Sequence, residues 1–180
     1  MCLHMSASTG RDMKTEPNDN EFLDFAVRPN RIHWPPLLYV ATLAAAYGLQ
    51  WLVPLQPVRL GAWQAIAGVV LLAAGTVSAG WAFSTFRSAG TPVNPTEAAK
   101  FLVVKGIYRI TRNPMYLGVV LAFTGLGLVF GSVWLLVLVA PMAIGLHGLA
   151  ILREERHLEV RFGEDYRTYK AATSRWIGPI

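Results

Sequence analysis

The stretch that decides the fold runs from Met115 to Leu152, MYLGVVLAFTGLGLVFGSVWLLVLVAPMAIGLHGLAIL, and its 38 residues include no formally charged side chain. A single helix of that length would extend about 57 Å at about 1.5 Å per residue, whereas the hydrocarbon core of a bilayer is only about 30 Å thick. The stretch therefore predicts a helical hairpin that turns at Gly131 and Ser132. Its two arms are expected at about 115–130 and 133–152.

Two further apolar runs precede the hairpin. The first extends over about residues 37–53 and has prolines at both of its ends, Pro35, Pro36, Pro54 and Pro57. Proline is tolerated in the first turn of a helix and breaks a helix interior, so both boundaries of this run are marked. The second run lies between Arg59 and Arg87 without a charged residue, and it accommodates a span at about 62–84.

The composition agrees with a chain that faces lipid. It is 53% hydrophobic and only 15% charged, whereas soluble domains carry about 25% charged residues. The net charge of +5 and the pI of about 9.7 are compatible with nucleic-acid binding, but the basic residues lie beside the apolar runs, which favours membrane orientation instead. We therefore expect an all-α integral membrane protein with about four transmembrane helices and no nucleic-acid partner.

Loop charges predict the orientation, because cytoplasmic loops carry an excess of Lys and Arg. Arg59 is the one basic residue in the loop between the first two runs, whereas the segment before the third run has five basic residues: Arg87, Lys100, Lys105, Arg109 and Arg112. A further group of six basic residues follows the last run: Arg153, Arg156, Arg161, Arg167, Lys170 and Arg175. Both termini and the second loop are thus expected in the cytoplasm, with the protein in a bacterial-type inner (plasma) membrane.

The N-terminal residues 1–27 are polar, with two basic and five acidic side chains, and we expect a mobile cytoplasmic tail there. Residues 28–180 then form the membrane domain. Cys2 is the only cysteine, which excludes an intramolecular disulfide and a cysteine-based zinc cluster. No metal site is predicted.

Two polar segments share the predicted cytoplasmic face, and they carry the candidate chemistry. In the first, Asn113-Pro114 is typical of a helix start, with Asn as the N-cap and Pro at the first helical position. The free N–H groups of such a helix start can bind a carboxylate or a phosphate. In the second, Glu154 and Glu155 stand where the last span leaves the membrane. Each of these residues is also compatible with a simple role as an anchor at a helix end.

Together these segments resemble the isoprenylcysteine carboxyl methyltransferases, and the related phospholipid N-methyltransferases share a similar layout. The resemblance extends over about residues 86–177. It rests on the run Leu102-Val103 to Gly106, on Arg112-Asn113-Pro114-Met115-Tyr116-Leu117-Gly118, and on Glu154-Glu155, Leu158, Phe162-Gly163, Tyr166 and Tyr169.

The resemblance implies a small membrane enzyme that uses S-adenosylmethionine without a Rossmann domain. By resemblance, Glu154 is the catalytic carboxylate near the reacting end of the substrate. The implied cofactor pocket consists of Lys100, Phe101, Leu102, Val103, Tyr108, Asn113, Pro114 and Tyr116. Glu155 is expected beside Glu154, where the paired carboxylates suit the cationic sulfonium.

Two departures from the family pattern concern the substrate. Asn113 stands where His is commoner, so a proton-transfer role at that position is not expected. Ala150 stands where prenyl-protein enzymes carry an Arg, so a substrate carboxylate would lose its bidentate partner.

The predicted function is methyl transfer to a lipophilic small molecule or a membrane lipid, either a prenylcysteine-like carboxylate or another lipid-soluble acceptor. Residues 165–177 are expected to form an amphipathic cover over the pocket. A phospholipid amine N-methyltransferase, an NADPH-dependent reductase of the sterol-reductase type and a non-enzymatic membrane adaptor remain the alternatives. The oligomeric state stays open.

Overall fold

The computed structural model describes residues 32–59, 61–90 and 97–177, and all regular structure in these ranges is helical. In chain order the elements are α2 (Trp34–Leu52), α3 (Ala62–Ser88), the 3-10 turn η1 (Gly106–Arg109), α4 (Pro114–Phe130), α5 (Val133–Leu146), the π-turn η2 (His147–Ile151) and α6 (Leu152–Ala172). The tail predicted at 1–27 lies outside the described residues.

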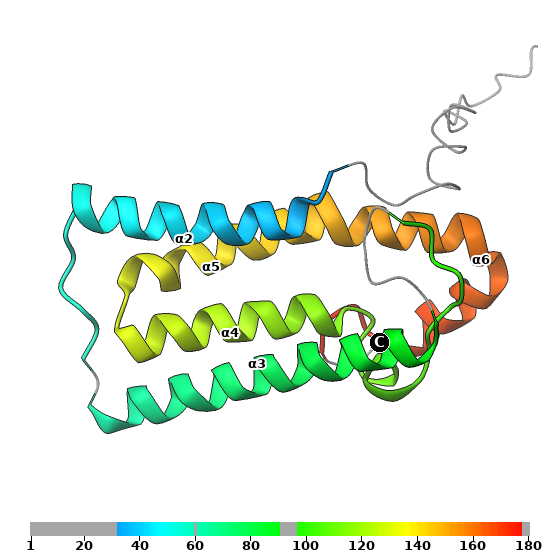
Figure 1. Ribbon diagram of the computed structural model, residues 1–180, viewed down its shortest axis with the longest axis horizontal. Helices are drawn as coiled ribbons and strands as arrows, with labels where there is room; N and C mark the ends of the chain where they lie inside the picture. Colours follow the sequence, from blue (N-terminus) through cyan, green and yellow to red (C-terminus); the bar gives the residue numbers. More distant parts are fainter. Residues whose placement is uncertain (1–31, 60, 91–96, 178–180) are drawn as a thin grey trace, which may run out of the picture.

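The four apolar helices lie side by side along the long axis of the molecule (Figure 1). α2 packs against α5, α5 packs against α4, and α4 packs against α3, so the two helices that come first in the chain lie on opposite sides of the bundle. α6 continues from α5 beyond the ends of α3 and α4 and then turns back toward them (Figure 1). One end of the bundle is therefore enclosed by polar helix and loops.

The predicted apolar segments are all helical, with small shifts at their ends. α3, with 27 residues, and the continuous helix Val133–Ala172, with 40, are long and apolar enough to cross a membrane, and α4 is a shorter apolar helix. The apolar part of the 40-residue helix ends near Leu152, as predicted, but the helix itself continues as the charged α6. The four-span topology and its orientation stay predictions.

Glycines let α3 and α4 approach at backbone contact. A Cβ added at Gly118 would lie 2.6 Å from the carbonyl oxygen of Gly75, and one added at Gly125 would lie 2.6 Å from that of Gly68. The glycines are seven residues apart on each helix, which places each pair on one helix face. Close contact of this kind is typical of small residues at interfaces between membrane helices.

The hairpin turn forms where the sequence predicts it. α4 ends at Phe130, and Gly131 adopts φ 63°, a left-handed conformation that costs glycine little. The hydroxyl of Ser132 then accepts a hydrogen bond of 3.2 Å from the N–H of Leu135, which caps α5. α4 and the start of α5 therefore lie within one residue of the two predicted arms.

Two irregularities direct the polar end of the long helix. Between α5 and α6, the residues His147–Ile151 form one π-turn. Within the charged α6, at Gly163, the backbone leaves helical geometry with φ 51° and ψ −120°. The bend at Gly163 turns the last part of α6 back toward the bundle (Figure 1), which brings Tyr166 into a fully buried position.

Candidate active site

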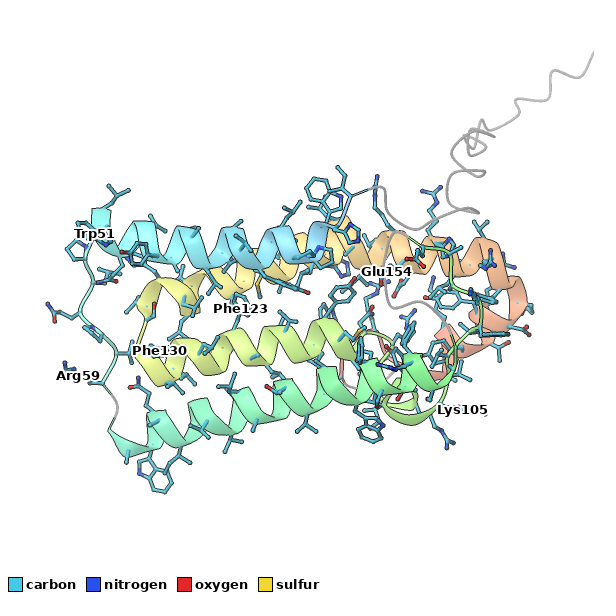
Figure 2. The ribbon with its side chains drawn as sticks, viewed as in Figure 1. Trp51, Arg59, Lys105, Phe123, Phe130 and Glu154 are labelled. Carbon is cyan, nitrogen blue, oxygen red and sulfur yellow. The ribbon has the colours of Figure 1, made fainter. Side chains whose placement is uncertain are left out.

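A cavity of about 300 Å³ lies at the end of the bundle that α6 encloses. Its walls come from the start of α2, the end of α3, residues 97–103, η1, the start of α4 and α6. Figure 2 shows Trp51, Arg59 and Phe130 at the opposite end of the bundle, whereas Glu154 lies in the half that also holds Lys105. The cavity is thus at the end that the loop charges predict to be cytoplasmic.

Nine of the ten residues predicted for the site line this cavity: Phe101, Leu102, Val103, Tyr108, Asn113, Pro114, Tyr116, Glu154 and Glu155. Lys100 is exposed and is not among the lining residues. The fold therefore brings together residues as far apart in the sequence as Phe101 and Glu155. Lys100 directly precedes Phe101 in the chain but does not line the cavity.

Tyr116 and Glu154 form the polar centre of the cavity. Tyr116 is in the first turn of α4, and its hydroxyl donates a hydrogen bond of 2.5 Å to Oε1 of Glu154 in the first turn of α6. Burial raises the pKa of Glu154 to about 7, the hydrogen bond from Tyr116 opposes this rise, and the charge of Glu155 adds to it. Glu154 can therefore both accept and hold a proton near neutral pH.

The second carboxylate, Glu155, is held by two arginines rather than left free in the cavity. The Nε and one terminal nitrogen of Arg175 donate bidentately to its two oxygens at 2.8 and 2.7 Å. Nη1 of Arg112 lies 3.2 Å from Oε1 of the same carboxylate. Because Glu155 is only 6% exposed, the two guanidinium groups compensate a charge that would otherwise be costly to bury.

Arg112 also offers an unused donor. Its side chain is 9% exposed and lines the cavity. Its Nη1 is within 3.4 Å of the hydroxyl of Tyr166, while its Nε is buried and has no hydrogen-bond partner among the described residues. A buried guanidinium N–H without a partner is unfavourable unless a ligand satisfies it. Arg112 belongs to the quoted motif but was not predicted as a site residue.

Asn113 occupies the N-cap position of α4, but its side chain does not cap the helix. This corrects the expectation drawn from the Asn113-Pro114 pair. The side-chain amide instead donates a hydrogen bond of 3.0 Å to the carbonyl oxygen of Arg175. Arg175 belongs to the C-terminal segment, residues 173–176, which lies directly against the start of α4. A partner so far along the chain cannot be identified from a local motif.

Aromatic side chains form one wall of the cavity. The ring of Tyr108 packs edge-on against Phe86 with centroids 5.1 Å apart, and the hydroxyl of Tyr169 donates a hydrogen bond of 2.7 Å to the carbonyl oxygen of Tyr108. Burial raises the pKa of Tyr108 above its usual range, so its ring is neutral at physiological pH. Neutral aromatic faces of this kind can bind a cation.

Two other contributors, Tyr39 and His157, escaped the sequence analysis, and a third, Arg175, lies in the predicted cover at residues 165–177. Tyr39 reaches the cavity from α2 and packs on Phe123 at a centroid distance of 5.9 Å. The Nε2 of His157 accepts a hydrogen bond of 3.3 Å from the N–H of Ala99, which ties residues 97–103 to α6. Arg175 acts from the C-terminal segment. Tyr39 and His157 lie in no recognisable motif.

The fold and the cavity define a class: an all-helical protein with membrane-length apolar helices and a carboxylate-rich cavity at one end, without a separate nucleotide-binding domain in the described residues. The sequence model of the phospholipid methyltransferase family matches residues 63–165, more than half of the chain. The chain belongs to this family, in agreement with the predicted resemblance. Membership implies a methyltransferase that is associated with a membrane.

No curated protein and no solved structure matches the chain. The matched region contains α4, α5 and most of α6, but α2 and the segment after residue 165 lie outside it. The family match therefore does not include Tyr39, which lines the cavity, or Arg175, which binds Glu155 from outside it.

Proposed function

We propose that the protein transfers a methyl group from S-adenosylmethionine to a lipophilic acceptor in the cavity between α4 and α6. The observation that carries the proposal is the cavity of about 300 Å³ that unites the Tyr116–Glu154 pair with the unpartnered Nε of Arg112. Methyl transfer from a sulfonium demands mainly that donor and acceptor be aligned, and alignment alone can supply several kcal/mol. A site built from rigid helix starts suits that task.

The side chains of the cavity fit the chemical groups of this cofactor. The carboxylate of Glu154 and the ring of Tyr108 suit a sulfonium cation. Nε of Arg112 suits a carboxylate, for which guanidinium groups are the preferred partners. The apolar side chains of Leu102 and Val103 provide a surface for a flat base. When bound, the cofactor would supply an activated methyl group.

The charges of the cavity favour an amine or another acceptor that carries a proton over a carboxylate acceptor. Among the described residues, Glu97, Glu154 and Glu155 line the cavity. Glu155 is compensated by Arg112 and Arg175, so the carboxylate that an acceptor beside Tyr116 would face is that of Glu154. A carboxylate acceptor beside Glu154 would be repelled, and Ala150, which is fully buried, offers it no partner. Glu154, with its pKa raised to about 7, can take the proton that an amine must lose before it is methylated.

This preference favours the phospholipid amine alternative over a prenylcysteine-like carboxylate, and the family match also accommodates it. The membrane location provides access for either acceptor, because a lipid can reach the cavity laterally while a water-soluble cofactor enters from the polar end. On the predicted orientation, that polar end faces the cytoplasm.

Isothermal titration of the purified protein in detergent with S-adenosylmethionine, and separately with NADPH, tests the proposal. We expect binding of S-adenosylmethionine and none of NADPH. Methyl transfer from radiolabelled cofactor to phosphatidylethanolamine and to N-acetyl-S-farnesylcysteine then distinguishes the two acceptor chemistries. Tight NADPH binding without S-adenosylmethionine binding would replace the methyltransferase with a reductase, and label in the farnesylcysteine alone would overturn the preference for an amine.

A further inference from the structure

The segment Thr173–Trp176, which follows α6, lies across the start of α4. The carbonyl oxygen of Ser174 accepts a hydrogen bond of 2.9 Å from the N–H of Arg112. The carbonyl oxygen of Arg175 accepts two more, from the hydroxyl of Thr111 at 3.1 Å and from the side-chain amide of Asn113 at 3.0 Å. Three consecutive residues before α4 are thus bound to two consecutive residues of the C-terminal segment.

These contacts are buried, so they are costly to lose. Thr111 is 1% exposed, Asn113 is 7% exposed and Thr173 is 5% exposed. Trp176 packs against the apolar cluster that contains Tyr116. Buried polar groups that lose a partner without gaining water are strongly unfavourable. These contacts therefore hold the segment against the start of α4.

Arg175 connects this backbone contact to the other wall of the cavity. Its guanidinium binds Glu155, in the first turn of α6, through both oxygens. Its own side chain is 32% exposed and it is not among the residues that line the cavity. Arg175 thus joins the start of α4 to the start of α6 without facing the cavity itself.

Glu155 links Arg175 to Arg112, because both guanidinium groups bind its carboxylate. The carboxylate has two cationic partners, and the closer contacts are those to Arg175, at 2.8 and 2.7 Å against 3.2 Å to Arg112. Without Arg175, the buried carboxylate would depend on Arg112 alone. Arg112 would then be drawn toward Glu155, because a buried charge needs full compensation, and its contact with the hydroxyl of Tyr166 would be weakened.

We propose that Arg175 is a positioning residue of the site, which sets the orientation of the Arg112 guanidinium through Glu155 and the position of the start of α4 through its carbonyl oxygen. Arg175 touches no ligand in this arrangement. The consequence for binding rests on the methyltransferase function proposed above, while the consequence for the chain itself does not.

The test compares Arg175→Ala and Arg175→Lys with a matched control, Arg167→Ala, in the full-length protein in detergent. Arg167 is also on the charged α6, but it is 61% exposed and pairs with the half-buried Glu159. One measurement is the affinity for S-adenosylmethionine by isothermal titration. The other is hydrogen exchange in peptides that include residues 111–113, where the N–H of Arg112 bonds to the carbonyl oxygen of Ser174.

We expect Arg175→Ala to weaken S-adenosylmethionine binding by on the order of tenfold or more and to accelerate exchange at residues 111–113. Arg175→Lys should recover part of the affinity, because lysine keeps the charge but not the bidentate geometry. Millimolar methylguanidinium should restore binding to Arg175→Ala. The control Arg167→Ala should change the affinity by less than about twofold, as exposed ion pairs contribute little.

Unchanged affinity in Arg175→Ala overturns the proposal, and faster exchange without an affinity change makes Arg175 merely structural and overturns it as well. If Arg175→Ala does not fold, the comparison of Arg175→Lys with the wild type decides, and equal affinities count against the proposal. Failure of the wild type to bind S-adenosylmethionine would end the proposed function. Faster exchange at residues 111–113 in Arg175→Ala would then still support the part of the inference that concerns the start of α4, and unchanged exchange would overturn it.

Discussion

The hydroxyl of Tyr116 and the carboxylate of Glu154 are joined by a hydrogen bond of 2.5 Å that links the first turn of α4 to the first turn of α6. The two residues are 38 positions apart, and between them the chain runs the length of the bundle and back. The pair thus forms only when the hairpin of α4 and α5 is complete. Because Tyr116 donates the bond, Glu154 keeps one oxygen available for a ligand.

We expect Tyr116→Phe and Glu154→Gln each to reduce methyl transfer by roughly 10- to 150-fold, since loss of one oriented contact to a charged group costs about 1.5–3 kcal/mol. Neither change alters the apolar length of a helix, so both variants should remain folded. The control is Glu164→Gln, whose side chain is 81% exposed, and its rate should stay within about twofold of the wild type. Rates in the two site variants equal to that of the control would place the reaction elsewhere.

The raised pKa of Glu154 predicts a pH dependence of stability. The folded protein holds the Glu154 proton up to a pKa of about 7, whereas the ordinary pKa of a glutamate, as in the unfolded chain, is about 4.5. This contribution to stability is fully present below about pH 4.5 and is lost as the pH rises through about 7. Thermal unfolding of the wild type and of Glu154→Gln between pH 4.5 and pH 8 checks it. The wild type should lose Tm relative to the variant over this range, and parallel curves would show that Glu154 does not titrate there.

Arg112→Lys isolates the unpartnered Nε. Lysine retains a charge for Glu155 but lacks the guanidinium Nε, so we expect S-adenosylmethionine affinity to fall on the order of tenfold. Arg109→Lys is the matched control, because Arg109 is an exposed arginine on η1, shortly before Arg112 in the chain. Titration of both variants measures the effect. Equal affinities would mean that the Nε of Arg112 does not contact the cofactor.

Gly118→Ala should disrupt the contact between α3 and α4, since the added Cβ would lie 2.6 Å from the carbonyl oxygen of Gly75. Overpacking of this kind costs about 1–3 kcal/mol. Gly80→Ala, on α3, has nothing within 4 Å of the added Cβ and should be neutral or stabilising by up to about 1 kcal/mol from helix propensity. Thermal unfolding in detergent compares the two variants. Equal losses of Tm would show that helix propensity, not close packing, decides the outcome.

Cysteine accessibility tests the predicted orientation. In a Cys2→Ser background, a cysteine at Gln56, in the loop between α2 and α3, should react with an impermeant thiol reagent from outside intact cells. A cysteine at Lys105, at the opposite end of the bundle (Figure 2), should react only after the cells are opened. Both positions are exposed in the structure. The reversed labelling pattern would invert the topology and place the cavity on the outer face.

Much of the fold follows from local signals in the sequence. The length of the charge-free run requires a turn, and Gly131 with Ser132 supplies the left-handed residue and the cap that make one possible. The prolines at 35, 36 and 114 mark helix starts for the same local reason, because proline lacks the N–H that a helix interior needs. Such signals depend only on residues within one turn of each other, so they can be identified from the sequence.

Pairings between distant residues escape such analysis. The positions of Glu154 and Glu155 beside the cavity agree with the resemblance, but the commitment of Glu155 to Arg175 and of Asn113 to the Arg175 carbonyl depends on where the C-terminal segment lies. That position depends on the bend at Gly163, which has a positive φ. The presence of a glycine in the sequence does not by itself predict its φ angle. Lys100 shows the opposite case, in which proximity in sequence did not imply a place in the cavity.

The π-turn at His147–Ile151 gives the cavity a property that no single side chain has. A π-turn adds one residue to the helix, and this extra residue rotates the residues that follow by roughly 100° about the helix axis. Glu154, Glu155 and His157 therefore reach the cavity as a set, and their direction depends on the number of residues between them and α5. Insertions or deletions between residues 147 and 151 would reset the whole set at once, whereas the same change in the loop between α2 and α3 would leave it untouched. The number of residues in this one turn therefore determines which side chains of α6 face the cavity.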